Sequence, residues 1–179
     1  MNFVEYKDNK KIKKDVKPLF LSAFPEDERP SAYYFFKSFK KEDNHLFAFY
    51  DDGLFVGFAS LIIYKDICYI FFLAVSPELR GQGYGSKILS ELKNIYSNYV
   101  LLLCYEEVDK KYEDYEYRCK REAFYKKNGF LDNNLKTNEF GVVFQTVYIG
   151  KHQVPFSDYQ QIFVKGFGEF TIKFLKQEQ

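Results

Sequence analysis

The hydrophobic and polar positions of this chain follow two periods, and the changes between them predict its elements. Between residues 11 and 23, apolar side chains recur at helical spacing and predict a helix. Residues 2–6 are predicted to form a short first strand. A second helix is expected to begin at Pro30 or Ser31. Its aromatic residues are Tyr33, Tyr34, Phe35, Phe36 and Phe39.

Three strand-like runs come next, separated by turn residues. They read HLFAFY, LFVGFASLIIY and ICYIFFLAV, with Asp-Asp-Gly after the first and Lys-Asp after the second. Short polar links between β-rich runs favour an antiparallel meander. Pro77 restricts Ser76 to extended conformations and removes a backbone donor. The third strand should therefore end at this point.

A strand–helix–strand unit follows the meander. Residues 84–96 place apolar side chains mainly on one face of a helix. Val100–Cys104 is a continuous apolar run, as expected of a strand covered on both faces. Two strands joined through a helix in one sheet are parallel, and the connection is right-handed. The sequence therefore predicts one parallel strand pair.

The last part of the chain has a weaker pattern. Residues 106–116 are mostly acidic and are predicted to form an exposed loop. A helix around Lys120–Lys127 should stop at the Asn-Gly that follows, because glycine is the usual residue after a helix C-terminus. Phe140–Ile149 is predicted as a strand. Residues 157–176 have apolar side chains at helical intervals, although two glycines within them weaken a helix.

These elements predict an α/β (α+β) fold with a mixed, mostly antiparallel sheet and a central parallel strand pair flanked by helices. With 179 residues, the chain has the length of one domain. We therefore expect a single domain over residues 1–179, with its core motifs at about 45–150 and a C-terminal extension at about 151–179.

Composition and charge exclude several classes of function. The formal net charge is +1, so no overall field attracts nucleic acid or an anionic membrane. The 21 Phe and 16 Tyr residues are interpreted as core. The three cysteines lack metal-ligand spacing and the two histidines are far apart, so no metal site is expected. Without a signal-like N-terminus or an apolar run of about 18 residues, a cytoplasmic protein is expected.

The stretch RGQGYGS, residues 80–86, holds three of the ten glycines. A glycine-rich turn between a strand and a helix can direct several backbone N–H groups into one small volume, and the helix N-terminus adds partial positive charge. This arrangement suits a pyrophosphate. The spacing G-x-G-x-G does not match the dinucleotide fingerprint G-x-G-x-x-G, and Gly-Ser-Lys reverses the order of the P-loop. An ordinary tight turn is the structural alternative.

The wider context of this stretch resembles the GNAT superfamily of N-acetyltransferases. Its acetyl-CoA signature, [QR]-x-x-G-x-[GA], is met by Arg80 to Gly85, directly after LAVSPEL. A second family segment of the type FYxKxGF appears as FYKKNGF, residues 124–130. The resemblance covers about residues 45–150 and implies a GNAT-like fold, with acetyl-CoA as co-substrate and no metal.

The resemblance also implies which residues bind the co-substrate. In the family, acetyl-CoA lies between two parallel strands that splay apart, and its pantetheine arm takes the hydrogen bonds of the missing strand. Here the pantetheine is expected against Leu73, Ala74 and Val75. The pyrophosphate is expected at the turn, whose cofactor-binding residues are Arg80, Gly81, Gln82, Gly83, Tyr84, Gly85 and Ser86.

The catalytic residues are implied in the same way, with one departure from the family. Tyr125 matches the family tyrosine that protonates the leaving thiolate as general acid. Many relatives carry a carboxylate base at about the position of Phe71, which cannot take a proton. We rank Glu106 first as the substitute base. The other substitutes are Glu107, Glu26, Glu28 and water relays to backbone groups.

The predicted function is acetyl-CoA-dependent transfer of an acetyl group to a primary amine, with a small molecule as acceptor and direct attack as the mechanism. Phe71 keeps open a non-catalytic acyl-CoA-binding module. Acetylation of a protein N-terminus or lysine is a further alternative. Tyr125 as a packed aromatic and Glu106 as a surface carboxylate remain open, as does the stretch 33–36 as acceptor pocket or core-facing helix. No nucleic-acid or membrane partner is expected, and a homodimer is left open.

Overall fold

The computed structural model describes residues 1–26 and 29–178. The chain divides into two compact units, one formed by Met1–Ile63 with Ile70–Ile95 and the other by Tyr64–Tyr69 with Tyr96–Gln179. No helix in the described part of the chain is both long enough and apolar enough to span a membrane.

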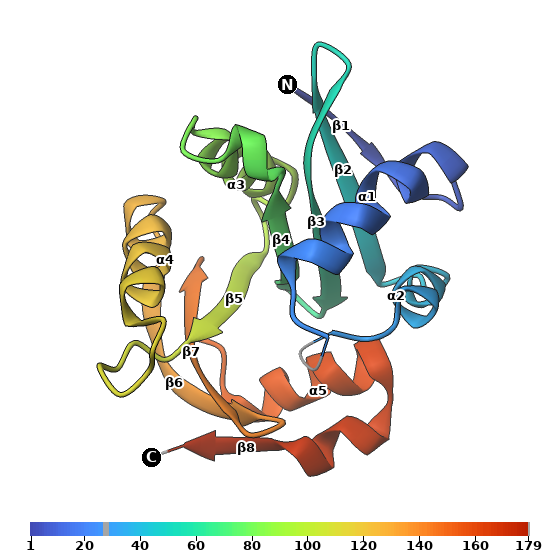
Figure 1. The fold of residues 1–179 in the computed structure, drawn as a ribbon. Coiled ribbons are helices and arrows are strands. Elements are labelled where there is room, and N and C mark those ends of the chain that lie inside the picture. Colours follow the sequence, from blue (N-terminus) through green and yellow to red (C-terminus); the bar gives the residue numbers. More distant parts are fainter. Residues whose placement is uncertain (27–28, 179) are drawn as a thin grey trace. The chain divides into compact units, whose positions relative to one another are not determined.

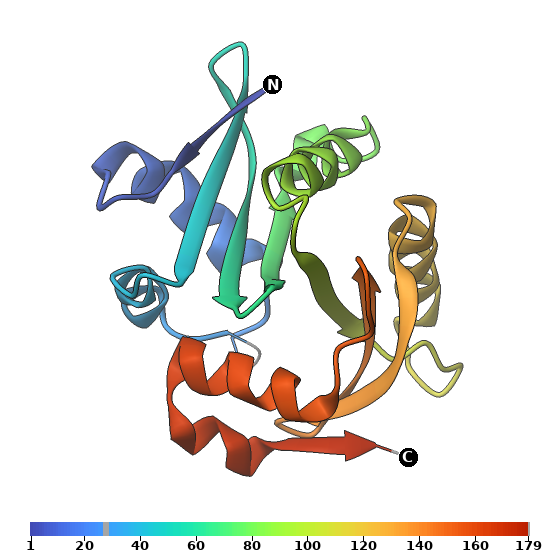
Figure 2. The same cartoon turned by 180° about the vertical axis from the view of Figure 1, so that it is seen from behind.

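The elements appear in Figure 1, and Figure 2 shows them from behind. The helices are α1 (Lys10–Ala23), α2 (Ala32–Ser38), η1 (Pro77–Leu79), α3 (Tyr84–Ile95), α4 (Tyr115–Lys127), α5 (Phe156–Phe167) and η2 (Glu169–Phe174). The strands are β1 (Asn2–Glu5), β2 (Asn44–Asp51), β3 (Leu54–Tyr64), β4 (Ile67–Val75), β5 (Val100–Glu106), β6 (Leu131–Glu139), β7 (Val142–Ile149) and β8 (Leu175–Glu178).

The first unit is a sheet covered on one face by α1 and α2. Strand β2 pairs antiparallel with β3, which confirms this part of the predicted meander, and it also pairs antiparallel with β1. Helix α1 crosses in front of β2 and β3 in Figure 1 and behind them in Figure 2. Its N-terminus is capped by Asn9, whose side chain accepts from the Lys11 and Ile12 amides. Phe20 of α1 stacks on Phe35 of α2 at 3.9 Å between ring centroids.

The second unit is built around β5. The start of β4 pairs with β5 in parallel, from Ile67–Val100 to Tyr69–Leu102, so the predicted parallel pair is confirmed. Strand β7 pairs antiparallel with both β5 and β6, and β6 pairs antiparallel with β8. Figure 2 shows α5 running alongside the η2–β8 segment. The strand order over the described residues is β1-β2-β3-β4-β5-β7-β6-β8, and the predicted fold class is confirmed.

Several element predictions were wrong in their details. Helix α4 begins at Tyr115, five residues before the predicted start. Strands β6 and β8 were missed, and the tail helix α5 ends at Phe167, where Gly168 adopts a φ of 112°. In α2 the core-facing side chains are Phe35 and Phe36, whereas Tyr33 and Tyr34 are 67% and 64% exposed. The residues 33–36 therefore divide between core and surface.

Candidate active site

The glycine turn between η1 and α3 adopts a backbone conformation that requires glycine. Gly81 has a φ of 75° and Gly83 a φ of 82°, both in the left-handed region. A Cβ on either residue would meet no heavy atom within 4 Å. The backbone conformation, rather than protein packing, therefore excludes side chains at these positions, and the space beside them is open to a ligand.

Backbone N–H groups without helical partners gather at the start of α3. The Lys87 amide donates to the Gly83 carbonyl at 3.1 Å, which is the first hydrogen bond of the helix. The amides of Tyr84, Gly85 and Ser86 precede that bond and have no intrahelical acceptor. Together with the positive end of the helix dipole they suit an anion such as a pyrophosphate.

Two side chains brace the turn from its flanks. Arg80 Nε donates to the Val75 carbonyl at 3.1 Å, and Gln82 Nε2 donates to the Glu78 carbonyl at 2.9 Å. Both residues are exposed. Arg80 therefore lies at the exposed rim of the turn and connects the turn to the end of β4.

Tyr84 anchors the start of α3 to the end of β2. Its hydroxyl donates to Asp51 Oδ2 at 2.9 Å. This hydrogen bond is the main reason why the pKa of Asp51 lies below its usual value and the pKa of Tyr84 above. The side chain of Tyr84 thus holds the helix in place, which leaves its backbone amide as the group that can contact a ligand.

At the end of β4, one edge of the strand is hydrogen-bonded to β3 and the other edge faces away from β3. The Phe72 amide donates to Ser60 Oγ and the Ser76 amide donates to the Val56 carbonyl, both on β3. Backbone groups alternate sides along a strand, so those of Leu73 and Val75 point away from β3.

Ala74 contacts β3 instead. A Cβ on Gly57 of β3 would lie 2.2 Å from the Ala74 carbonyl oxygen, so that carbonyl faces Gly57. The expected backbone contacts for a pantetheine arm therefore narrow to Leu73 and Val75. Gly57 is a residue that the sequence analysis missed: it lets β3 and β4 approach closely, and a lone glycine within a predicted strand was its only signal.

Tyr125 lies on α4 within a group of aromatic rings. Its ring stacks on Tyr105 of β5 at 5.7 Å and meets Phe130 edge-on at 5.8 Å between centroids. Among the described residues, its hydroxyl has no hydrogen-bond partner. Burial raises the pKa of Tyr125 to about 12, while Arg121 opposes the rise and Cys104 adds to it. The hydroxyl is therefore protonated at neutral pH and free to donate.

Glu106 at the end of β5 is buried and forms an ion pair with Arg121 of α4. A carboxylate that is hydrogen-bonded to a guanidinium must give up that interaction before it takes a proton. The structure therefore places the first-ranked base beside a cation, in the same unit as Tyr125.

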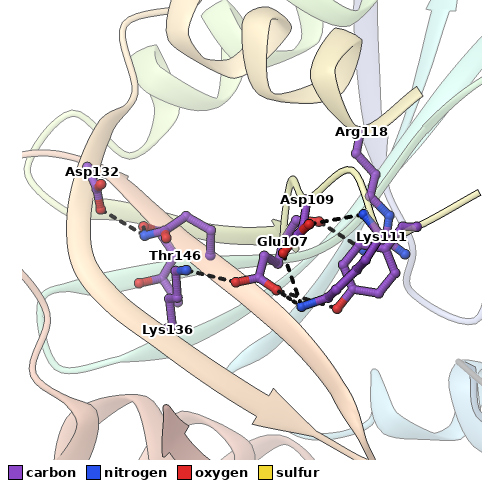
Figure 3. Close-up of polar contacts among 9 residues, drawn as sticks. Glu107, Asp109, Lys111, Arg118, Asp132, Lys136 and Thr146 are labelled. Atoms are coloured by element: carbon purple, nitrogen blue, oxygen red, sulfur yellow. Dashed lines mark hydrogen bonds and ion pairs between the residues drawn. The ribbon is translucent and has the colours of Figure 1, made fainter. Parts of the chain in front are cut away.

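Glu107 has more charged partners than Glu106. Figure 3 shows its carboxylate between two lysines, with Lys111 at 2.9 Å and Lys136 at 2.8 Å. These two hydrogen bonds lower the pKa of Glu107. Arg118 donates to its backbone carbonyl at 3.0 Å. This network stabilises the ionised form and disfavours Glu107 as a proton acceptor.

Glu26 is exposed, and Glu28 lies outside the described residues. Phe71 packs against Phe72, with ring centroids 4.4 Å apart, at the border of the core of the first unit. Within residues 1–26 and 29–178, no group of three or more His, Cys, Asp or Glu side chains could hold a metal ion.

The structure combines an α/β sheet with a glycine turn, at the start of a helix, whose geometry suits a phosphate-bearing ligand. The family model "Acetyltransferase (GNAT) family" matches residues 11–130, and the chain belongs to this family. Membership confirms the predicted class of enzyme, an N-acyltransferase that uses acetyl-CoA as co-substrate. No curated protein sequence matches the chain.

Solved structures share the fold at low sequence identity. A protein from Bacteroides thetaiotaomicron assigned to the GNAT family is 19% identical, with a TM-score of 0.74 over 90% of this chain and 93% of that one. An aminoglycoside 6′-N-acetyltransferase in complex with coenzyme A is 18% identical, with a TM-score of 0.66 over 87% and 98%. The ribosomal-protein-S18-alanine N-acetyltransferase from Escherichia coli is 15% identical, with a TM-score of 0.61 over 86% and 97%.

Proposed function

We propose that this protein transfers the acetyl group of acetyl-CoA to a primary amine of a small molecule, by direct attack and with Tyr125 as general acid. The observation that carries the proposal is the turn before α3, where Gly81 and Gly83 leave open space beside three unpaired helix amides. The β4 edge at Leu73 and Val75 that points away from β3 supports a second contact, with the amides of the pantetheine arm.

The residues of this chain have distinct roles in the proposed reaction. The turn binds the pyrophosphate, and the β4 edge orients the arm, so that the thioester is held for attack. The Tyr125 hydroxyl protonates the sulfur as the carbon–sulfur bond breaks. The high pKa of Tyr125 makes it a weak acid on its own, and Arg121 assists by favouring the phenolate that remains.

The identity of the acceptor amine is less constrained than that of the acetyl donor. The solved structures with this fold include enzymes named for aminoglycosides and an enzyme named for the alanine of a ribosomal protein. A screen of thiol release across polyamines, amino acids, aminoglycosides and peptides with free N-termini identifies the amine class. Release with peptides alone would favour the protein-acetylating alternative.

Binding is tested first, by thermal unfolding with acetyl-CoA. At a ligand concentration of about 100 times the dissociation constant, linkage gives about 2.7 kcal/mol of stabilisation. Gly83→Val should abolish the shift, since its side chain enters the open space beside the amides. Gly53→Val is the matched control: Gly53 has a φ of 83° and nothing within 4 Å of a Cβ, but it lies in the β2–β3 turn. A folded Gly83→Val protein that binds normally would contradict the proposed cradle.

The role of Tyr125 separates an enzyme from a binding module. Tyr125→Phe keeps the ring and its stacking on Tyr105, so acetyl-CoA affinity should change little. Turnover should fall by about 10²–10⁴-fold, the usual contribution of one general acid. The loss should appear equally in kcat and kcat/KM, because the interaction forms in the transition state. Tyr117→Phe, at an exposed position of the same helix, is the control. Wild-type activity in the Tyr125→Phe variant would exclude the acid role.

A further inference from the structure

A chain of hydrogen-bonded side chains crosses the interior of the second unit. Cys104 Sγ of β5 lies 3.1 Å from the Tyr69 hydroxyl of β4. The Tyr69 hydroxyl lies 3.1 Å from the Tyr159 hydroxyl of α5. The Tyr159 hydroxyl donates to Glu139 Oε1 of β6. Four elements distant in sequence therefore contribute to one continuous hydrogen-bonded path.

The inner end of this path is a buried carboxyl without a recorded cation. Glu139 is 8% exposed, and Tyr69 and Tyr159 are fully buried. Its recorded side-chain partners are two hydroxyls, that of Tyr159 and that of Thr137 at 2.9 Å. Val142 of β7 and Leu175 of β8 lie opposite it in the strand registers. Among the described residues no Lys, Arg or His is paired with it.

The absence of a paired cation sets Glu139 apart from Glu106 and Glu107, the two carboxylates at the end of β5. Burial raises the pKa of Glu139 to about 7, and its hydrogen bonds with Tyr159 and Thr137 oppose the rise. Glu106 and Glu107, by contrast, are paired with Arg121 and with lysines. A carboxyl that exchanges its proton near neutral pH is suited to general-base catalysis.

The outer end of the path lies near the proposed general acid. Cys104 is only partly buried, and it follows four buried residues of β5. A charge on Cys104 raises the pKa of Tyr125, and Arg121 lowers the pKa of both groups. Tyr105, the next residue of β5, stacks on Tyr125. The path therefore begins at the residue that precedes a direct neighbour of the proposed general acid.

We propose that Glu139 is the terminal proton acceptor of the acetyl transfer, reached through Cys104, Tyr69 and Tyr159. The proposal rests on the proposed function, and it supplies the base that Phe71 cannot provide. Glu139 does not touch the substrate and acts through the three intervening side chains. The sequence analysis missed it because a single glutamate in a polar segment has no distinguishing pattern.

In the proposed reaction the amine loses one proton and the departing sulfur gains one. The amine nitrogen bonds to the acetyl carbon, and the sulfur departs with the electron pair of the broken bond and takes the Tyr125 proton. The amine proton moves to Cys104 Sγ while the thiol proton moves to Tyr69. The Tyr69 proton then moves to Tyr159, whose own proton neutralises the Glu139 carboxylate. One proton then returns from Glu139 along the path to Cys104 and passes through solvent to the Tyr125 phenolate, which restores both groups.

The experiment compares pH profiles of kcat/KM for wild-type protein and Glu139→Gln, with an amine found active in the screen. The amide keeps the size of the side chain and an oxygen that accepts from Tyr159, but it does not titrate. The wild-type rate should rise with pH through a midpoint near 7, set by Glu139. In Glu139→Gln that limb should disappear and the rate at pH 8 should fall by about 10²–10⁴-fold.

Variants along the path distinguish a proton relay from a structural network. Cys104→Ser keeps a hydroxyl in the path and should retain most of the rate, whereas Cys104→Val should lose it. Tyr69→Phe should lower the rate as Glu139→Gln does, while the ¹³C signal of the labelled Glu139 carboxyl still titrates near neutral pH. Tyr50→Phe is the matched control, because it removes a phenol–carboxylate hydrogen bond of 2.8 Å to Asp15 in the first unit.

The possible results distinguish failure of the proton relay from failure of the proposed function. Turnover by Glu139→Gln with an unchanged pH profile would overturn the relay and leave the proposed function intact. Equal rates for Cys104→Ser and Cys104→Val would also overturn it. If wild-type protein acetylates no amine, the proposed function fails and the relay fails with it. Loss of the acidic limb in Glu139→Gln together with rescue by Cys104→Ser supports the relay.

Discussion

Replacing Glu139 with glutamine should change how the stability of this protein depends on pH. The glutamate is buried among apolar residues and two hydroxyls, and its pKa is raised from 4.5 to about 7. At about 1.4 kcal/mol for each pH unit, this difference corresponds to about 3 kcal/mol of folding free energy. Glutamine has the same size but does not titrate, so it contributes no such pH dependence to the folding free energy.

The sign follows from proton binding in the two states. Between pH 4.5 and about 7, the folded state holds a proton on Glu139 that the unfolded state has released. The free energy of unfolding therefore falls as pH rises through this window, and the contribution is fully lost above pH 7. Glu139→Gln should gain about 3 kcal/mol relative to wild type between pH 4.5 and pH 8.

Urea unfolding of both proteins at several pH values between 4.5 and 8 measures this difference. Subtracting the two curves removes the contributions of all other groups, provided that the m-values agree. Glu113→Gln, at an exposed position, is the control and should show no such trend. A wild-type-to-variant difference that stays constant within about 1 kcal/mol over the whole range would refute the raised pKa of the buried carboxyl.

Two further substitutions probe backbone contacts. Gly57→Ala places a methyl group 2.2 Å from the Ala74 carbonyl oxygen and should lower the free energy of unfolding, measured with urea, by about 1–3 kcal/mol. Acetyl-CoA binding should also weaken, because the β4 edge shifts. Unchanged stability and affinity would contradict the close approach of β3 and β4. Asn133→Ala removes the side chain that accepts from the Val154 amide at 2.7 Å and donates to the Val154 carbonyl at 2.8 Å, and should cost at least about 2 kcal/mol in the same assay. Asn133→Asp, which keeps only the acceptor, should fall between wild type and alanine.

Local signals in the sequence were enough for several elements. The predicted strands over residues 54–64 and 67–75 match β3 and β4 residue for residue, because Gly, Asp and Pro impose their turns through their own backbone preferences. The glycine turn was predicted on the same basis. Its left-handed residues and unpaired amides depend on a stretch of seven neighbouring residues.

Strand β6 shows where local signals fail. Its buried positions alternate at Asn133, Leu135, Thr137 and Glu139, so the period of a strand is present, but three of the four are polar. A pattern of hydrophobic residues cannot reveal such a strand. The buried polar side chains are tolerated because β7, α5 and the Val154 segment supply their hydrogen-bond partners.

The candidate chemistry divides in the same way. The sequence by itself determined the family, the turn that suits a pyrophosphate and the tyrosine proposed as acid, since each depends on a short contiguous motif. Only the tertiary structure decided which carboxylates are neutralised by cations and which is not. Glu106 is paired with Arg121 from another element, whereas Glu139 is enclosed by hydroxyls and apolar strands. The proton affinity of a carboxyl depends on its surroundings in space, and those surroundings come from residues far apart in the chain.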